Sequence, residues 1–199
     1  MKIGEWNYNN RRVAQAAGVP ELLNEVGEEL KLKGELPTSI IEIGTYYGGF
    51  TEMLRDSVLS ENCKEIITFE ILDRANLAES FKNTGINFNL LDALSASGRN
   101  IIQKEIDREG KTIVFCDGGN KVNEFHYVSN MLKVGDIILA HDYAYDSNTF
   151  NTKLRDTVWN WFEIEYGKIQ GACEANSLEK CEFTSRFEGK AWACFQKTK

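Results

Sequence analysis

The chain has 199 residues, of which 42% are hydrophobic, and its formal net charge is −7 at pH 7. A chain of this size can bury one hydrophobic core, so we expect a single domain over residues 1–199. The acidic charge argues against a broad surface for nucleic acid or anionic lipid, and no apolar run is long enough to span a bilayer.

The cysteines and the N-terminus indicate the compartment. The five cysteines are an odd number without close pairing, and Cys116 and Cys194 lie in apolar, strand-like runs where a free thiol behaves as a small buried hydrophobe. The polar N-terminus lacks the apolar core of a secretion signal. We therefore expect a soluble, cytoplasmic protein without a membrane segment.

Helical and strand patterns alternate along most of the chain. The segment 19–34 places Leu22, Val26 and Leu30 on one face and predicts an amphipathic helix that ends at Gly34. Further helices are predicted at 49–60, 74–83, 97–110, 123–135 and 152–167. Strands are predicted at 39–44, 65–71, 86–91, 112–117 and 136–142. The chain closes with a predicted hairpin over 181–197 that turns at Glu188-Gly189.

This alternation predicts the fold class. Strands joined through helices form a mostly parallel sheet, so we expect a doubly wound, Rossmann-like α/β domain with helices on both faces. The terminal hairpin adds an antiparallel edge. Within the domain we expect an N-terminal helical extension over 1–36, a core over 38–145 that carries the ligand sites, and a C-terminal helix and hairpin over 146–199.

Every predicted parallel strand ends in an acid. The strand ends carry, in chain order, Glu42, Glu70, Asp92, Asp117 and the pair His141-Asp142. Ligands of open α/β sheets bind outside the carboxyl ends of the strands. Any one of these residues could instead cap a helix or form a turn. We interpret the whole row as a ligand site.

The segment IIEIGTYYGGFTEML (40–54) connects the first strand to a helix through glycines. It lacks the G-x-G-x-x-G pattern of a dinucleotide site and the Gly-Lys-Ser/Thr ending of a phosphate loop. Gly44 and Gly48 allow the backbone to pass close to a ligand, while Tyr46 could line its side or simply pack in the fold. Thr51 offers a hydroxyl and an N–H to a carboxylate. Glu70 lies where a ribose diol usually binds.

At these residues the sequence resembles the class I S-adenosylmethionine-dependent methyltransferases. The likeness is to metal-dependent O-methyltransferases of the catechol O-methyltransferase and cephalosporin hydroxylase-like types. It covers about residues 38–145 and is carried by IIEIGTYYGGFT, ITFEILD, LLDAL and IVFCDGGNK…GDIILAHDY. The resemblance implies that Glu42, Gly44 and Gly48 shape the pocket for the methionine end of the cofactor. It also implies that Thr51 contacts the cofactor carboxylate, Glu70 the ribose and Asp92 the adenine. The predicted cofactor-binding set is completed by Thr45, Tyr46 and Asp117.

A second group of residues is expected to carry the chemistry. In the metal-dependent relatives, acids at the positions of Asp117 and Asp142 bind a divalent cation, usually magnesium, so we predict a metal site of Asp117, His141 and Asp142. His141 stands where the family has an acid, which leaves Mg²⁺ or Mn²⁺ open. Alternatively His141 is the general base, or it simply hydrogen-bonds within its loop. Lys121 lies one residue further from Asp117 than the catalytic lysine of the catechol enzymes, and could be only an ion-pair partner. The predicted catalytic residues are His141, Lys121 and Asp117.

We therefore expect an S-adenosylmethionine-dependent O-methyltransferase, assisted by a divalent metal, that acts on a hydroxyl of a small molecule or sugar. The acceptor pocket would include Trp6, Tyr8, Arg11, Arg12, the loop 143–150 and the segment after Gly167. A nicotinamide-dependent oxidoreductase or epimerase and a non-catalytic cofactor-binding module remain as alternatives. The only two prolines, Pro20 and Pro37, precede the first predicted strand, so an Asn/Asp-Pro-Pro-Tyr/Phe motif for DNA base methylation is excluded. The oligomeric state is open, a homo-oligomer included.

Overall fold

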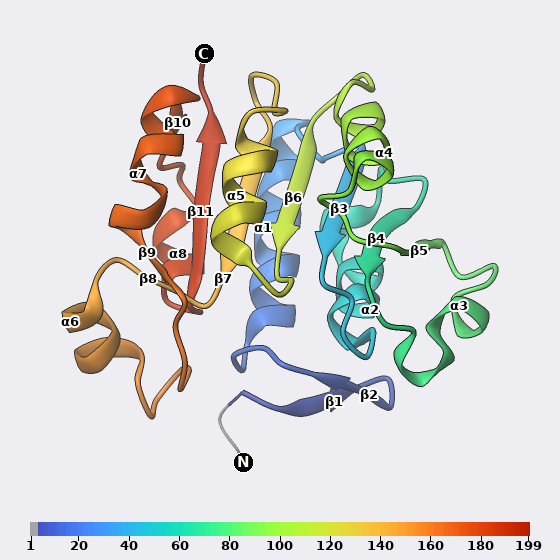
Figure 1. Ribbon diagram of the computed structural model, residues 1–199, viewed down its shortest axis with the longest axis horizontal. Coiled ribbons are helices and arrows are strands. Elements are labelled where there is room, and N and C mark those ends of the chain that lie inside the picture. Colours follow the sequence, from blue (N-terminus) through green and yellow to red (C-terminus); the bar gives the residue numbers. More distant parts are fainter. Residues whose placement is uncertain (1–3) are drawn as a thin grey trace.

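A seven-stranded sheet organises the computed structural model, which describes residues 4–199 (Figure 1). Its strand order is β10-β11-β7-β6-β3-β4-β5. Neighbouring strands from β7 to β5 are parallel, whereas β11 is antiparallel to both β7 and β10. The predicted mostly parallel sheet with an antiparallel C-terminal edge is therefore confirmed. The strand bounds are β3 Ser39–Ile43, β4 Ile66–Glu70, β5 Ile86–Leu90, β6 Thr112–Cys116, β7 Ile137–His141, β10 Leu178–Glu179 and β11 Trp192–Lys197.

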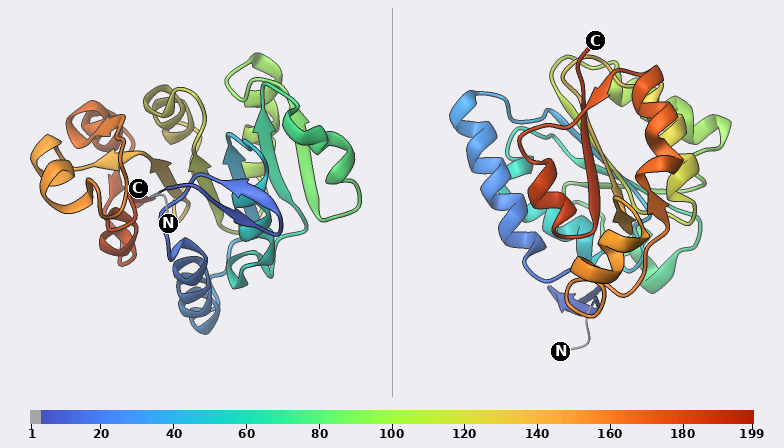
Figure 2. Two further views of the ribbon diagram at one scale, coloured as in Figure 1. Left: turned by 90° about the horizontal axis from the view of Figure 1, so that it is seen from below. Right: turned by 90° about the vertical axis from the view of Figure 1, so that its left-hand side faces the viewer.

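Helices cover both faces of this sheet (Figure 2). One face packs against α1 (Val19–Lys33), α2 (Gly49–Asp56) and α8 (Thr184–Glu188), and the other against α4 (Ala96–Ile106), α5 (Lys121–Ser129) and α7 (Tyr166–Ala175). Side chains alternate between the two layers, because successive residues of a strand point to opposite faces. Ile40 belongs to the first core cluster and Ile41 to the second. Both are fully buried, which explains the near-continuous apolar strands of the sequence.

The N-terminal extension contains a hairpin as well as the predicted helix. Strands β1 (Trp6–Tyr8) and β2 (Arg11–Val13) pair antiparallel before α1 begins. Asn9 and Asn10 make the turn with φ of 45° and 65°, a backbone that asparagine tolerates. The hairpin lies beyond the carboxyl ends of the parallel strands (Figure 1). The helical extension expected over 1–36 thus contains a hairpin before its helix, and residues 1–3 lie outside the described part.

The predicted helix at 152–167 is wrong. This stretch is divided among a π-helix (Phe150–Leu154), an irregular segment over 155–163, β9 (Ile164–Glu165) and the start of α7. Asp156 has φ +60°, which ends any right-handed helix. The N–H groups of Glu163 and Ile164 donate to the carbonyl of Asp142, which anchors β9 beside β8 (Tyr143–Ala144). Tertiary pairing therefore overrides the helical periodicity of the sequence.

The predicted hairpin over 181–197 is also wrong in its turn. Glu188 ends the short helix α8, and Gly189 continues with φ −65° instead of a hairpin turn. Strand β11 pairs with β7 on one side, with Trp192 opposite His141, and with β10 on the other. This pairing brings the indole of Trp192 to the carboxyl end of β7.

The remaining elements are shorter than predicted. The helix expected at 74–83 is a 3-10 turn η2 (Arg74–Asn76) and α3 (Leu77–Ser80), and the one at 49–60 ends at Asp56 before η1 (Val58–Ser60). A short helix α6 (Ser147–Thr149) follows β8. Among residues 4–199, no helix combines the length and apolar composition needed to cross a bilayer.

Candidate active site

A cavity of about 480 Å³ opens at the carboxyl ends of β3, β4, β5 and β6. This volume lies within the range of roughly 300–1,000 Å³ that small-molecule and cofactor sites occupy. The predicted residues Gly44, Tyr46, Glu70, Asp92 and Asp117 all line it. The rest of its wall is formed by Ile43, Phe69, Ile71, Arg74, Leu91, Ala93, Leu94, Gly118, Gly119, Asn120, Asn123 and Glu124.

The glycine turn after β3 approaches the loop after β6 very closely. Gly44 has φ +97°, and a Cβ atom added there would lie 2.3 Å from the carbonyl oxygen of Asp117. Tyr46 has φ +53°, and its N–H donates to Oε2 of Glu70 at 2.9 Å. Only a residue without a side chain therefore fits at position 44, between this turn and the loop after β6. Gly48 has another role, since a Cβ there would lie 2.5 Å from the ring of Phe81.

Glu42 lies beneath this turn, fully buried. Its Oε2 accepts from the hydroxyls of Thr51 and Thr68, each at 2.6 Å, and the Thr45 hydroxyl is 2.6 Å from that of Thr68. Its Oε1 has no hydrogen-bond partner among the described residues. Burial raises the pKa of Glu42 to about 8. Thr51 thus points to Glu42 and does not line the cavity, so its predicted contact with a cofactor carboxylate stays a prediction.

Asp117 and His141 form a hydrogen-bonded pair next to the cavity. Nδ1 of His141 donates to Oδ1 of Asp117 at 3.0 Å, because a carboxylate oxygen can only accept. Nε2 is buried and has no hydrogen-bond partner within residues 4–199. The imidazole is stacked against Trp192, with centroids 4.7 Å apart, and is 2% exposed. This arrangement fixes the ring and leaves Nε2 as its acceptor nitrogen.

Lys121 and Asp142 form an ion pair on the other side of His141. Nζ of Lys121 is 3.0 Å from Oδ2 of Asp142 and 3.5 Å from Oε2 of Glu163. Burial lowers the pKa of Lys121, but the negative charges of Asp117 and Asp142 outweigh it, so that this pKa lies above its ordinary value. The ammonium therefore stays charged at neutral pH, in keeping with the ion-pair alternative.

The predicted metal ligands do not converge on one point. Asp117, His141 and Asp142 are neighbours, but Nδ1 of His141 points to Asp117 itself and lies 3.6 Å from Oδ1 of Asp142. Within residues 4–199, no group of three or more His, Cys, Asp or Glu side chains is arranged to hold a metal ion. The side chains as placed do not fit the predicted cation.

Several residues of the site have no clear signal in the sequence. Nε2 of Gln15 donates to Oδ2 of Asp117 at 2.7 Å, and Nε1 of Trp159 donates to Oδ1 of Asp142 at 2.6 Å. Glu124 accepts from the N–H groups of Gly118 and Asn120, which fixes the loop after β6. Burial raises the pKa of Glu124 to about 7. Of these residues, only Glu124 could have been predicted to contact the site, because it lies in the first turn of the helix that follows the DGGN segment.

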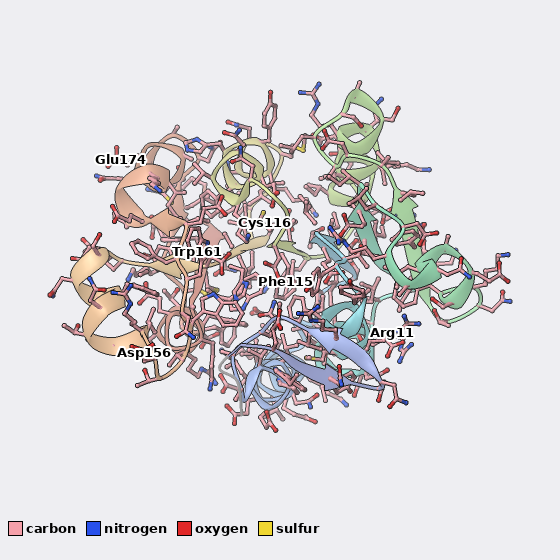
Figure 3. All side chains as sticks on the ribbon, turned by 60° about the horizontal axis from the view of Figure 1, so that its bottom comes forward. Arg11, Phe115, Cys116, Asp156, Trp161 and Glu174 are labelled. Carbon is pink, nitrogen blue, oxygen red and sulfur yellow. The ribbon has the colours of Figure 1, made fainter. Side chains whose placement is uncertain are left out.

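The side of the molecule expected to receive an acceptor combines two distant segments. Figure 3 shows Arg11 of the hairpin and Trp161 of the irregular segment on either side of Phe115 and Cys116 of β6. Trp161 is 64% exposed, whereas the Arg11 side chain forms an ion pair with Glu52 at 2.8 Å. The guanidinium of Arg12 lies over the rings of Tyr46 and Tyr47. The N-terminal hairpin and the irregular segment thus lie at the same end of the sheet, whereas α7 leads from Gly167 to β10 at the other end, where Leu178 pairs with Lys197.

No protein-family model matches this sequence, and no curated protein matches it significantly. Solved structures are similar in fold. An apo structure of CmcI-N160 has a TM-score of 0.63 at 14% identity, covering 98% of this chain and 76% of that one. The MycE methyltransferase from the mycinamycin biosynthetic pathway, in complex with Mg, SAH and mycinamycin VI, has a TM-score of 0.51 at 13% identity, over 88% of this chain and 49% of that one.

A third similar structure is the CurJ carbon methyltransferase, with a TM-score of 0.52 at 13% identity over 90% of this chain and 55% of that one. This chain spans about half the length of the MycE and CurJ chains. At such identities the likeness concerns the fold, which is shared by methyltransferases of different acceptors. The chain therefore has the fold of the S-adenosylmethionine-dependent methyltransferases, as its sequence motifs predict.

Proposed function

We propose that this protein is an S-adenosylmethionine-dependent methyltransferase that acts on a hydroxyl group of a small molecule or sugar. The observation that carries the proposal is the glycine turn at Gly44, which borders the cavity and has no room for a Cβ atom. The same cavity is lined by Glu70 and Asp92 at the ends of neighbouring strands. A cavity of this size, bordered by a tight backbone turn and by two acceptors at neighbouring strand ends, suits a nucleoside joined to an amino acid.

Different residues of the cavity would bind different parts of the cofactor. Glu70 would accept from the ribose hydroxyls, Asp92 would contact the adenine amino group, and Gly44 would border the methionine end. Oε1 of Glu42, which has no partner among the described residues, would be available beneath the turn to a polar group. The bound cofactor supplies a methyl group on a positively charged sulfur, which an oxygen nucleophile can attack.

His141 is the residue best placed to take the proton from the acceptor hydroxyl. Asp117 holds Nδ1–H, so the free lone pair is on Nε2, where a general base must have it. Lys121 is a poorer candidate because its ammonium contacts the carboxylates of Asp142 and Glu163. Since His141 is 2% exposed, an acceptor reaches Nε2 only after a covering side chain moves. Trp159, whose ring centroid is 4.7 Å from that of His141, is one such neighbour.

The metal-assisted form of the reaction, expected from the resemblance to metal-dependent enzymes, is not part of this proposal. Asp117, His141 and Asp142 contact one another or other protein groups and do not surround a common point. The catalytic step is therefore assigned to the Asp117–His141 pair. A base next to the cavity supports transfer to a hydroxyl, because a hydroxyl needs its proton removed as it attacks.

A calorimetric titration tests this function. We expect S-adenosylhomocysteine to bind one site per chain with micromolar affinity, and NAD not to bind. Glu70→Ala should weaken S-adenosylhomocysteine binding, while Glu79→Ala, an exposed acid outside the cavity, should not change it. Binding of NAD in preference to S-adenosylhomocysteine would overturn the proposal in favour of an oxidoreductase or epimerase.

Methyl transfer itself separates an enzyme from a binding module with the same fold. The full chain would be incubated with S-adenosylmethionine and a panel of phenols, sugars and polyhydroxylated compounds, and methylated products would be detected by mass spectrometry. Transfer to a hydroxyl that His141→Ala abolishes would support the proposed base. Transfer that persists undiminished in His141→Ala would contradict that role.

A further inference from the structure

The ammonium group of Lys121 lies among acceptors at the N-terminus of α5. Its Nζ is 3.0 Å from Oδ2 of Asp142, 3.5 Å from Oε2 of Glu163 and 2.9 Å from the carbonyl oxygen of Gly118. An ammonium group has three N–H donors, so these three acceptors can engage all of them. The Lys121 side chain is 10% exposed. A positive charge is thus enclosed by the acids of the site.

The carboxylate oxygens at this centre are already occupied by protein donors. Asp117 accepts from His141 through Oδ1 and from Gln15 through Oδ2. Asp142 accepts from Trp159 through Oδ1 and pairs with Lys121 through Oδ2. Each of the four oxygens therefore faces a donor group.

The orientation of Gln15 is determined by a second contact. Its Oε1 accepts from the indole N–H of Trp192 at 2.9 Å, and an indole nitrogen can only donate. The amide nitrogen must consequently face Asp117. A magnesium ion needs oxygen ligands at about 2.0–2.1 Å, so it would have to displace these donors to bind here.

We propose that Lys121 is the resident cation of this centre, at the place where the sequence resemblance predicts a divalent metal, and that the centre works without a metal ion. The inference rests on the proposed function. Lys121 is a positioning residue: its charge offsets those of Asp142 and Glu163, and its N–H groups hold Asp142 beside His141. The distance of 3.6 Å between Nδ1 of His141 and Oδ1 of Asp142 reflects this placement.

Removal of the ammonium should convert the centre into a metal site. Without the ammonium, Oδ2 of Asp142, Oε2 of Glu163 and the carbonyl oxygen of Gly118 would lose their common donor and could bind a cation together. Carboxylate and carbonyl oxygens suit Mn²⁺. Lys121→Met keeps an unbranched side chain of similar length and removes the charge. Lys82→Met, at an exposed lysine that pairs with Glu79, removes the same charge away from the centre and is the matched control.

The experiment is a titration of each full-length protein with Mn²⁺ after treatment with EDTA and dialysis, followed by electron paramagnetic resonance of the free ion. We expect wild type and Lys82→Met to bind no Mn²⁺ specifically. Lys121→Met should bind one Mn²⁺ per chain, with an affinity at least about tenfold above any Mn²⁺ affinity of wild type. A tenfold difference in affinity corresponds to about 1.4 kcal/mol of binding free energy. A merely structural role of Lys121 would not create this affinity.

Two results would overturn the inference. One is specific binding of a single Mn²⁺ by the wild-type protein that is absent in Asp142→Asn. This result would show a metal site at the centre even if Lys121→Met does not fold. The other is a folded Lys121→Met protein with no gain in Mn²⁺ affinity. S-adenosylhomocysteine binding, measured on the same wild-type sample with and without EDTA, reports separately on the proposed function. Its loss under both conditions would sink the methyltransferase assignment and leave the Mn²⁺ result standing.

Discussion

Gln15 and Asp117 are joined by a hydrogen bond of 2.7 Å between the amide nitrogen and Oδ2, although 102 positions separate them in the chain. Gln15 is 1% exposed and lies in the segment between the N-terminal hairpin and α1. Its Oε1 accepts from Trp192 of the last strand. One side chain thus connects the N-terminal segment, the carboxyl end of β6 and the start of β11.

The first prediction concerns this connection. Gln15→Ala leaves an oxygen of the partly buried Asp117 carboxylate and the buried indole N–H of Trp192 without their partner, so the free energy of unfolding should fall by about 1–3 kcal/mol. The control is Gln103→Ala, because Gln103 also donates to an aspartate, Asp107, but at an exposed position. Its effect should stay within about 0.5 kcal/mol. Urea unfolding measures both, and equal effects would contradict the role of Gln15.

The second prediction concerns the glycine turn. Gly44→Ala combines an unfavourable φ of +97° with a Cβ atom 2.3 Å from the carbonyl oxygen of Asp117, so the turn must shift and the cavity must change shape. Gly119 lines the same cavity, but a Cβ atom there meets no atom within 4 Å. Calorimetry should show S-adenosylhomocysteine binding lost in Gly44→Ala and largely kept in Gly119→Ala. Intact binding in Gly44→Ala would refute the proposed role of the turn.

The third prediction is a pH dependence of stability. The pKa of Glu42 is raised from 4.5 to about 8 by burial, so the folded state keeps a proton that the unfolded state loses. The free energy of unfolding should therefore decrease as pH rises between these two values, by at most about 1.4 kcal/mol per pH unit from this group. Glu42→Gln cannot ionise and should reduce the slope. Part of the pH dependence that remains in Glu42→Gln comes from Glu124, whose pKa is raised to about 7. Urea unfolding at several pH values checks this, and an unchanged slope in Glu42→Gln would disprove it.

The fourth prediction separates cofactor binding from turnover. Asp142 does not line the cavity; it pairs with Lys121, and its Oδ1 lies 3.6 Å from Nδ1 of His141, so we expect it to position these two residues. In Asp142→Asn, turnover should fall by about 10²-fold, as expected when a proton-transfer group loses its orientation, while S-adenosylhomocysteine affinity stays near that of wild type.

Asp156→Asn provides the matched control for this variant. Asp156 and Asp142 have similar left-handed backbones, with φ of 60° and 57°, but Asp156 is exposed and lies outside the described centre. Asparagine adopts this backbone readily, so neither variant should strain the chain. Loss of S-adenosylhomocysteine binding in Asp142→Asn would contradict the division between the cavity and the catalytic pair.

The sequence predicted an element correctly where the packing of the fold agrees with the local pattern of apolar residues. Ile40 and Ile41 are apolar and adjacent because β3 is covered on both faces, and such strands between helices identify a parallel sheet. The segment 152–167 shows the limit of this reasoning. Its apolar residues recur with helical spacing, yet Asp156 takes a left-handed backbone and Glu163 hydrogen-bonds to Asp142. The contact of Glu163 with Asp142 is non-local, and a window of about 11–18 residues, as used to detect helical periodicity, does not contain both residues.

Some residues of the candidate site could likewise be predicted from the sequence, and others could not. Gly44, Glu70 and Asp92 could be predicted because strand ends meet at one edge of a parallel sheet. Gln15 and Trp159 could not, since their positions depend on how the hairpin and the irregular segment pack over that edge. The sequence allowed an ion pair of Lys121, but it could not indicate Glu163 as a partner, because Glu163 reaches the ammonium from a segment that the periodicity assigns to a helix.

The position of Trp192 in the final strand of the sheet has a consequence for biosynthesis. All residues that line the cavity precede α5 or lie within it, and a ribosome has translated them well before β11. The interval of translation between Glu124 and Trp192 is on the order of several seconds. Until Trp192 has been translated, the imidazole of His141 lacks its stacked indole, and Gln15 lacks one of its two partners. Trp192 can therefore enclose the Asp117–His141 pair only after the last strand of the sheet has been translated.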